Sequence, residues 1–292
     1  MYVMTPRCQL PPLIRAPQQP CRAAAATTTT TGTAALGAPS RADPDELRST
    51  WPQRAWTLAG SAAVISSLST SASLAADAGS FAEPLAAALA AYALADLATG
   101  VYHWFVDNYG DASTPFFGKQ IDAFQGHHRY PATITRREPC NNLHALARAI
   151  AVALPAVDAA ASAAGAPAAA HAFAGVFAAC VVLSQQFHSW AHENPRRLPP
   201  GVEALQAAGV LVSRAQHAAH HRAPYNNNYC IVSGMWNGLL DRHRVFEVLE
   251  MVVFFRTGVR PRSWDEPDAA WTEDTTVAVA VAVAATAIAG NE

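Results

Sequence analysis

The stretch Gln216-His217-Ala218-Ala219-His220-His221 determines how the rest of the chain is interpreted. Its three histidines occupy positions i, i+3 and i+4, so on a helix their imidazoles share one face. Neutral imidazole is a common ligand of iron, zinc, copper and nickel. We expect an amphipathic helix from Glu203 to His221, and its histidines predict a metal site if further ligands lie elsewhere in the chain.

Further histidines are grouped in the same way, and eight of the eleven in the chain fall into four clusters. The clusters are His103 alone, the pair His127-His128, His188 with His192, and His217 with His220 and His221. A single zinc ion takes at most four protein ligands, so eight histidines suit two metal ions better than one. Helical bundles hold metal pairs with ligands at such spacings. Of the others, His144 is a candidate outer ligand, and His171 and His243 are interpreted as structural or surface residues.

Composition excludes several classes of protein. Apolar residues make up 51% of the chain and charged residues only 14%, below the roughly 25% typical of soluble domains. A formal net charge of −2 argues against a nucleic-acid surface, so no nucleic-acid partner is expected. The five cysteines form no CxxC pattern, which indicates neither a disulfide framework nor a cysteine zinc site.

The amino-terminal segment has the composition of a targeting sequence. Residues 1–42 contain no Asp or Glu, but they carry arginines and a run of threonines from Thr27 to Thr31. This composition predicts a chloroplast transit peptide over residues 1–45, with a merely disordered tail as the alternative. We expect a linker and a marginal first apolar helix in 46–79, a histidine-rich membrane domain in 80–267 and a low-complexity Val-Ala tail in 268–292.

Long apolar segments predict an all-α membrane protein. The segments run from Trp56 to Ala76, from Pro84 to Val106, from Leu143 to Ala170 and from Ala172 to His192. The first is weakly hydrophobic, and prolines interrupt the third, which is one kinked span or a re-entrant pair. We therefore expect a bundle of three to four transmembrane helices with histidine clusters at the helix ends. Residues 235–255 mix aromatic and charged side chains and predict a helical cap at the membrane surface.

One apolar segment carries a polar stripe. Asp96, Gly100, His103 and Asp107 recur at helical spacing, so they lie on one face of the helix. Acids and a histidine on an apolar helix are expected to face the interior of a bundle rather than lipid. Asp107 lies one turn beyond His103, so it either binds the metal directly or accepts a hydrogen bond from an imidazole that binds the metal.

Four runs of sequence resemble the plant chloroplast fatty acid desaturase 4 family, within the wider lipid desaturase family that includes the plasmanylethanolamine desaturases. The runs are Gly100 to Gly110, Gln125 to His128 with Thr133 to Arg137, Gln185 to His192, and Ser213 to Tyr229 with Pro261 to Trp264. In the wider family a further histidine follows the His-His pair, where this chain has none between Arg129 and Arg137. That departure favours the chloroplast branch.

The resemblance implies a membrane desaturase that introduces a trans double bond at carbon 3 of palmitate at the sn-2 position of phosphatidylglycerol. It further implies two iron ions, O₂ as co-substrate, a ferredoxin-type electron donor, and a multi-pass place in the thylakoid or inner envelope membrane. On this interpretation the iron ligands are His103, His127, His128, His188, His192, His217, His220 and His221, with Asp107 beside them.

Some alternatives remain open from the sequence. Arg129, Arg136 and Arg137 either hold the lipid head group, since Arg suits phosphate, or simply form a positive loop beside the membrane. The same centre would also serve lipid hydroxylation or desaturation of an alkyl-ether lipid. A metal transporter is the non-enzymatic alternative, but it needs polar residues along a whole path, and these histidines cluster at segment ends.

Overall fold

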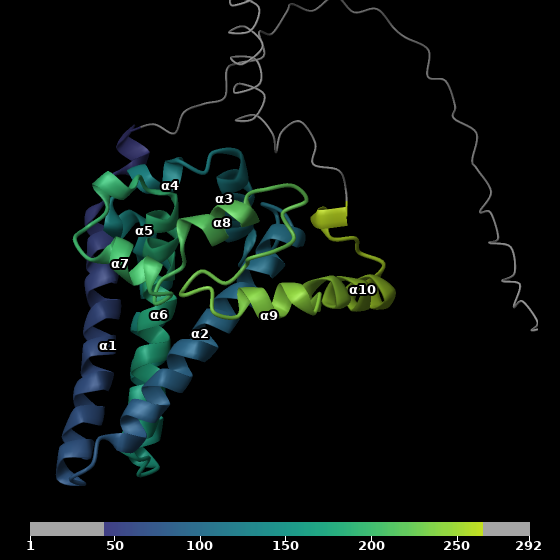
Figure 1. Ribbon diagram of the computed structural model, residues 1–292. Coiled ribbons are helices and arrows are strands. Elements are labelled where there is room, and N and C mark those ends of the chain that lie inside the picture. Colours follow the sequence, from purple (N-terminus) through teal and green to yellow (C-terminus); the bar gives the residue numbers. More distant parts are fainter. Residues whose placement is uncertain (1–43, 265–292) are drawn as a thin grey trace, which may run out of the picture. The chain divides into compact units, whose positions relative to one another are not determined.

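The computed structural model describes residues 44–264, and within that range all regular structure is helical (Figure 1). The all-α prediction is thereby confirmed. The four long helices are α1 (Trp51–Asp77), α2 (Ala82–Asn108), α5 (Pro139–Ala163) and α6 (Ala168–His192). The short ones are α3 (Gly118–Arg129), α4 (Thr133–Arg136), α7 (Val202–Ala207), α8 (Arg214–His220), α9 (Asn237–Arg242) and α10 (Val245–Thr257). The expected transit peptide up to residue 43 and the Val-Ala tail lie outside the described residues.

The four long helices are the candidate membrane spans. Each is apolar enough and, at 25 to 27 residues, long enough to cross a bilayer. The weak first segment therefore belongs to a full-length helix, α1, which begins at a capping box between Thr50 and Gln53. Of the expected three to four spans, the structure favours four.

Small residues allow the long helices to approach closely. α1 packs along α5 and α6, and α2 packs along α6. At Gly60 of α1 an added Cβ would lie 2.5 Å from the carbonyl oxygen of Ala147 on α5. Between apolar helices there is little hydrophobic driving force in lipid, so such close backbone contact is a main source of attraction.

The proline-rich third segment is divided between two helices. α5 runs through Pro155 without ending and stops at Ala163. A turn follows in which Gly165 has a φ of +65°, and Pro167 then caps the start of α6. The segment therefore forms one span and the beginning of the next, because Pro167 is tolerated before the first turn of a helix but not inside it.

The single helix expected from Glu203 to His221 is wrong. The chain forms α7, leaves it through Gly209 at a φ of +72°, and begins α8 only after Ser213. The Ser213 hydroxyl accepts a hydrogen bond from the Gln216 backbone N–H, which starts the new helix. The sequence Ser213-x-x-Gln216 is a capping signal that could have located this break.

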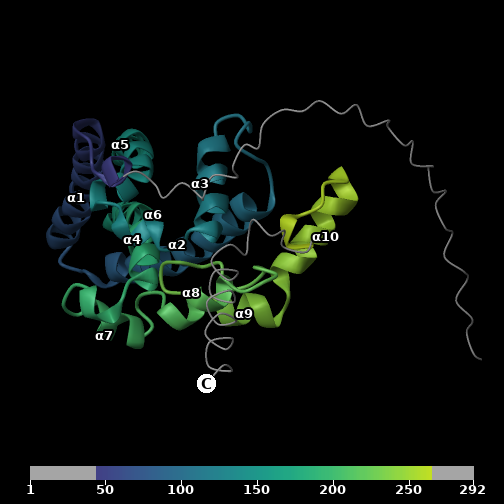
Figure 2. The same cartoon turned by 90° about the horizontal axis from the view of Figure 1, so that it is seen from above.

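The carboxy-terminal part of the described chain lies across the bundle. α9 and α10 run crosswise to α1, and α10 extends away from it (Figures 1 and 2). Val248, Met251, Val252 and Phe255 of α10 are each about half exposed or more. They recur at helical spacing, as on a helix that lies in a membrane surface. The membrane-surface cap stays a prediction.

A buried carboxylate fastens this part to α2. Asp96 is fully buried, and its Oδ1 accepts hydrogen bonds from the backbone N–H groups of Val232, Ser233 and Gly234 at 2.8 to 3.0 Å. One turn further along α2, Gly100 lies directly against Cys230, so any Cβ there would clash with the Cys230 sulfur. These contacts hold the loop before α9 against the carboxy-terminal half of α2.

Candidate metal centre

Nine side chains from four helices meet at one end of the bundle in two adjacent groups. The first group is His127, His188, His192, His217 and His221, and the second is His103, Asp107, His128 and His220. Within each group the possible ligand atoms all lie within 4.8 Å of one another. The ring centroids of His128 and His221, one from each group, are 4.7 Å apart, so the two groups are in contact.

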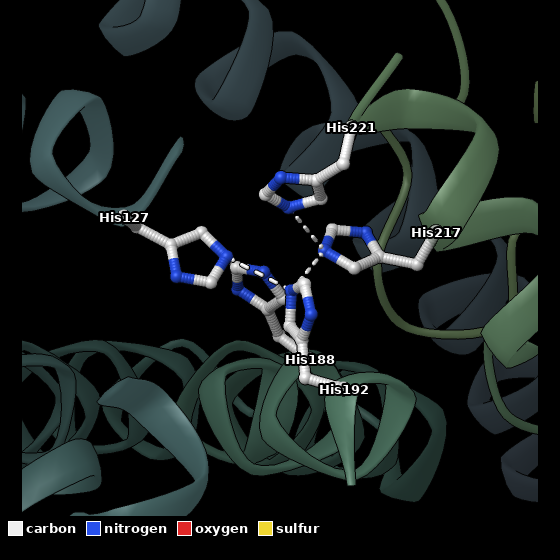
Figure 3. A group of neighbouring side chains, drawn as sticks. All are labelled: His127, His188, His192, His217 and His221. Atoms are coloured by element: carbon white, nitrogen blue, oxygen red, sulfur yellow. Dashed lines mark hydrogen bonds between the residues drawn. The ribbon is translucent and has the colours of Figure 1, made fainter. Parts of the chain in front are cut away.

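The first group is built from α3, α6 and α8 (Figure 3). His192 is central, because its Nε2 lies 2.9 Å from Nε2 of His127 and 2.7 Å from Nε2 of His217. Nε2 of His221 lies 3.1 Å from Nε2 of His217. Two imidazole nitrogens bound to one ion at about 2.1 Å are themselves about 3.0 to 3.4 Å apart, so these separations suit shared ligands of a metal.

His188, the fifth member of the first group, also indicates a metal site. Both ring nitrogens of His188 are buried, and neither has a hydrogen-bond partner among the described residues. A buried polar atom without a partner is costly, so its occurrence in a native site calls for an explanation. A metal ion would supply the missing partner, and the donor set of the first group fits one.

The second group surrounds a carboxylate. Oδ2 of Asp107 lies 3.2 Å from Nε2 of His103, 3.1 Å from Nε2 of His128 and 3.4 Å from Nε2 of His220. All four residues are at most 5% exposed. Three imidazole nitrogens and a carboxylate oxygen at these separations form a second donor set that fits a metal ion, and Asp107 is placed to bind directly.

Backbone carbonyls orient the rings of the second group. The Nδ1–H of His103 donates to the carbonyl oxygen of Tyr229 at 2.9 Å, and that of His220 donates to Asn227 at 2.7 Å. A proton held on Nδ1 leaves Nε2 free of hydrogen and able to bind a metal. The loop that Asp96 fastens to α2 therefore sets the orientation of two candidate ligands.

Burial also favours the neutral form of two imidazoles in the first group, His127 and His217. Burial, with the neighbouring imidazoles adding to it, holds the pKa of His127 and of His217 well below the ordinary value for histidine. Because a protonated ring cannot bind a metal, a lowered pKa keeps these side chains competent as ligands at neutral pH.

Neighbours in sequence serve different groups. His127 belongs to the first group and His128 to the second, because consecutive side chains on a helix point about 100° apart. His221 likewise joins the first group and His220 the second. The expectation that the three histidines of the Gln216–His221 stretch share one helical face is therefore wrong in part, since α8 ends at His220 and His221 follows it.

The remaining residues singled out from the sequence lie outside both groups. His144 bonds through Nδ1 to the carbonyl oxygen of Asn141 at 2.8 Å, and His171 bonds to Asp158 at 2.8 Å. His243 is exposed at the end of α9. Three exposed arginines lie at helix ends: Arg129 ends α3, Arg136 ends α4, and Arg137 follows α4 and donates to Asn141 Oδ1 at 2.9 Å.

Sequence reasoning missed the residues that hold the ligands in place. Asp96 was placed on the inward stripe, but its role as acceptor for the loop at residues 232–234 was not foreseen. Glu250 is 1% exposed and accepts hydrogen bonds from Trp104 Nε1 at 3.2 Å and Ser263 Oγ at 2.9 Å. The available signal was an acid directly before the apolar residues 251–255 of α10.

Comparison with known proteins identifies relatives over the same region. The lipid desaturase domain family matches residues 92–264. The chain is 53% identical over 228 residues to fatty acid desaturase 4, chloroplastic, of Arabidopsis thaliana, a match that covers 78% of this chain and 69% of that protein. It is 48% identical to fatty acid desaturase 4-like 1, chloroplastic, of the same plant, over 78% of this chain and 76% of the relative.

A more distant relative comes from a bacterium. The plasmanylethanolamine desaturase of Myxococcus xanthus is 33% identical over 189 residues, which cover 62% of this chain and 64% of that protein. No solved structure matches the chain. The family match takes in all nine residues of the two groups, and the chain belongs to the lipid desaturase family.

Proposed function

We propose that this lipid desaturase is a chloroplast membrane enzyme with a di-iron centre, and that it introduces a trans double bond at carbon 3 of palmitate at the sn-2 position of phosphatidylglycerol. The observation that carries the proposal is the pair of adjacent, largely buried donor groups at one end of four apolar helices. The identity of 53% to the chloroplastic fatty acid desaturase 4, against 33% to a plasmanylethanolamine desaturase, favours an acyl lipid over an ether lipid.

The two donor groups are proposed to hold one iron each. His127, His188, His192, His217 and His221 would bind the first iron, and His103, Asp107, His128 and His220 the second. Bound iron would supply the oxidising power that removes hydrogen from an unactivated carbon chain. Desaturation takes one hydrogen atom from each of two adjacent carbons, and O₂, two electrons and two protons complete the balance as two molecules of water. We propose a ferredoxin-type protein as the electron donor.

The chain's own residues would position the ligands and exclude water. The carbonyl oxygens of Tyr229 and Asn227 hold the protons of two imidazoles on Nδ1, so that Nε2 faces the iron. The rings of Phe124 and Tyr229 pack against His103, with centroids 5.2 and 5.7 Å away. These apolar walls would keep bulk water from the oxidising centre.

The exposed arginines before α5 are candidates for the lipid head group. Arg129 and Arg136 have exposed side chains, whereas Arg137 is engaged with Asn141. A guanidinium suits the phosphate group of phosphatidylglycerol. Arg136→Ala should therefore weaken selectivity for phosphatidylglycerol and leave the iron content intact; an unchanged lipid preference would remove Arg136 from this role.

The test of the function is fatty-acid analysis of purified phosphatidylglycerol from plastids that lack the activity. Complementation with the wild-type protein should restore trans-3-hexadecenoate, and complementation with His188→Ala should not. Restoration by both would contradict the assignment of His188. Restoration by neither, with wild-type protein present in the membrane, would assign the chemistry to another lipid, with alkyl-ether desaturation or hydroxylation next in line. Localisation in isolated membranes would separate the thylakoid from the inner envelope.

A further inference from the structure

A groove of about 530 Å³ opens between α1, α2, α3 and α5. Its walls come from α1, α2, the start of α3 and α5, and they include Trp56, Tyr102, Phe117, Gln120, Arg148 and Val152. α1, α2 and α5 are candidate membrane spans, and Val152 is 67% exposed on the outer face of α5. The groove is therefore open to the hydrocarbon region rather than enclosed within the protein.

One charged side chain lies in this apolar setting. Arg148 is exposed on α5, nine residues after Pro139 and so about 14 Å along the helix at 1.5 Å per residue. It makes no hydrogen bond or ion pair with any residue between 44 and 264. An arginine inside a membrane span is rare and normally has a partner, and it marks a functional site by default. The partner that fits an unpaired guanidinium at this place is a phosphate group.

Two aromatic rings, those of Tyr102 and Phe124, lie between the groove and the metal centre. Tyr102 lines the groove and immediately precedes His103 in α2. Its ring contacts Phe124 at a centroid distance of 5.9 Å, and Phe124 contacts His103 at 5.2 Å. The Tyr102 hydroxyl donates to Oε1 of Gln120 at 2.8 Å, which closes the wall on the α3 side. A chain in the groove would thus lie next to the rings that pack on the second donor group.

The mouth of the groove has a strained aromatic residue. Phe116 has a φ of +64° and a fully exposed ring. A bulky residue at positive φ is an outlier, and such strain gathers at ligand-binding sites. A fully exposed aromatic ring that lines the groove is suited to lie among lipid chains.

We infer that this groove binds the substrate as an anionic phospholipid, with its phosphate on Arg148 rather than on Arg129 or Arg136, and with the first carbons of its acyl chain against Tyr102, behind which Phe124 lies. The inference rests on the proposed function and specifies where its substrate lies. Desaturation close to the carboxyl end of a chain requires the head group to lie near the metal. Arg148 and Tyr102 both line the groove, and Tyr102 precedes His103 of the second donor group in the chain.

Filling the groove tests the position of the chain. Ala149 lines the groove, and Ala149→Trp should occupy it, whereas Ala160→Trp places the same side chain on the exposed face of α5, eleven residues further along. The probe is phosphatidylglycerol with a photoreactive diazirine on the sn-2 chain, in phosphatidylcholine nanodiscs with iron-loaded protein. Cross-links should map to residues 116–120 and 145–152 in the wild type and in Ala160→Trp, and fall about tenfold in Ala149→Trp with iron content unchanged. Cross-links that persist in iron-loaded Ala149→Trp, or that map to α10, would overturn the inference.

Changing the charge tests the phosphate site. In competition between labelled phosphatidylglycerol and diacylglycerol, which lacks the phosphate, Arg148→Gln should lose about tenfold of the preference for phosphatidylglycerol, the size of one charge-assisted hydrogen bond. Arg148→Lys should keep part of it, and Arg256→Gln, at an exposed arginine of α10, should keep all of it. An unchanged preference in Arg148→Gln would refute the phosphate site.

These measurements need no turnover, so their failure is distinct from failure of the proposed function. If the groove binds lipid but the product differs, cross-linking succeeds while trans-3-hexadecenoate is absent from the complemented plastids. If the function is right and the groove is wrong, Ala149→Trp makes the product at the wild-type rate.

Discussion

Histidines lie near both ends of α6, and they are held in opposite ways. His171 is in the first turn of α6, and His188 and His192 are in its last two turns, so the two regions are about 26 Å apart along the helix. At the first end, Nδ1 of His171 bonds to Asp158 Oδ1 at 2.8 Å, and Ser67 bonds to the same oxygen at 2.9 Å. At the other end, imidazole nitrogens face one another.

The difference shows how to separate a structural histidine from a ligand. Both His171 and His188 are 1% exposed, so burial does not distinguish them. The partner of Nδ1 does, because a carboxylate that is already present bonds to Nδ1 of His171 and leaves only its Nε2 without a partner, whereas both nitrogens of His188 lack a partner among the described residues. The first end is a polar contact between α1, α5 and α6, and the second is a donor set that fits an ion.

The largest effect is expected from removing ligands of the two donor groups. His127→Ala should lose iron from the first group and His128→Ala from the second, and each should abolish desaturation, because both irons are proposed to act together. Elemental analysis of the purified proteins measures iron per chain. The matched control is His171→Asn, which alters a buried histidine of the same helix bundle and should keep two irons. Two irons in either alanine variant would contradict the assignment.

A smaller effect is expected from Asp96, which supports the donor groups without joining them. Asp96→Ala leaves three buried backbone N–H groups without their acceptor, and each such loss costs about 1 to 3 kcal/mol. The thermal midpoint should fall, with partial loss of iron from the second group, because the Tyr229 and Asn227 carbonyls shift with the loop.

Asp96→Asn is the matched variant. It keeps one acceptor oxygen and should lie between the wild type and Asp96→Ala in both thermal midpoint and iron content. Full iron occupancy in Asp96→Ala would show that the loop does not orient the ligands.

Loss of the hydrogen bond between Asp158 and His171, at the start of α6, should lower the free energy of unfolding without changing the iron content. Asp158→Ala removes the partner of His171, at a cost of about 1 to 3 kcal/mol for a buried group left without a hydrogen bond. Iron content should stay at the wild-type level. Replacing both partners, as in Asp158→Leu with His171→Phe, should recover part of the lost stability, since an apolar pair needs no partner. Iron loss in Asp158→Ala would contradict the distinction between a structural histidine at the start of α6 and candidate ligands at its end.

The smallest effect is expected at His144, which the sequence left as a candidate outer ligand. Its ring bonds to the carbonyl oxygen of Asn141, and it belongs to neither donor group. His144→Ala should lower stability by about 0.5 to 1.5 kcal/mol, the net value of one hydrogen bond, and should keep both irons. Measured loss of iron would add His144 to the ligand set.

The sequence predicted the helices and the candidate ligands because both depend on local patterns. Apolar segments of membrane length became α1, α2, α5 and α6, and every histidine of the four clusters lies in a donor group. The division of the ligands between two groups was not predictable, because it depends on how four helices are rotated relative to one another. His127 and His128 are adjacent in sequence, and only their packing separates them.

The supporting residues could not be predicted for a related reason. Asp96 and its partners at 232–234 are more than 130 residues apart in sequence, and a stripe on one helix does not reveal which loop will meet it. The break between α7 and α8 had a local signal in Ser213 and Gln216, but the alanine-rich surroundings suggested a continuous helix.

The hydrogen bonds between Asp96 and the loop at residues 232–234 have a consequence for the order in which the site is assembled. A ribosome that has reached His221 has already produced every candidate ligand, but it has not yet produced the carbonyl oxygens at 227 and 229 or the loop at 232–234 that Asp96 holds. Glu250, with Ser263 and Trp264, adds a further attachment later still. The candidate ligands are therefore complete in the chain before the segment that orients two of them, and we expect iron loading only after the whole chain has been made.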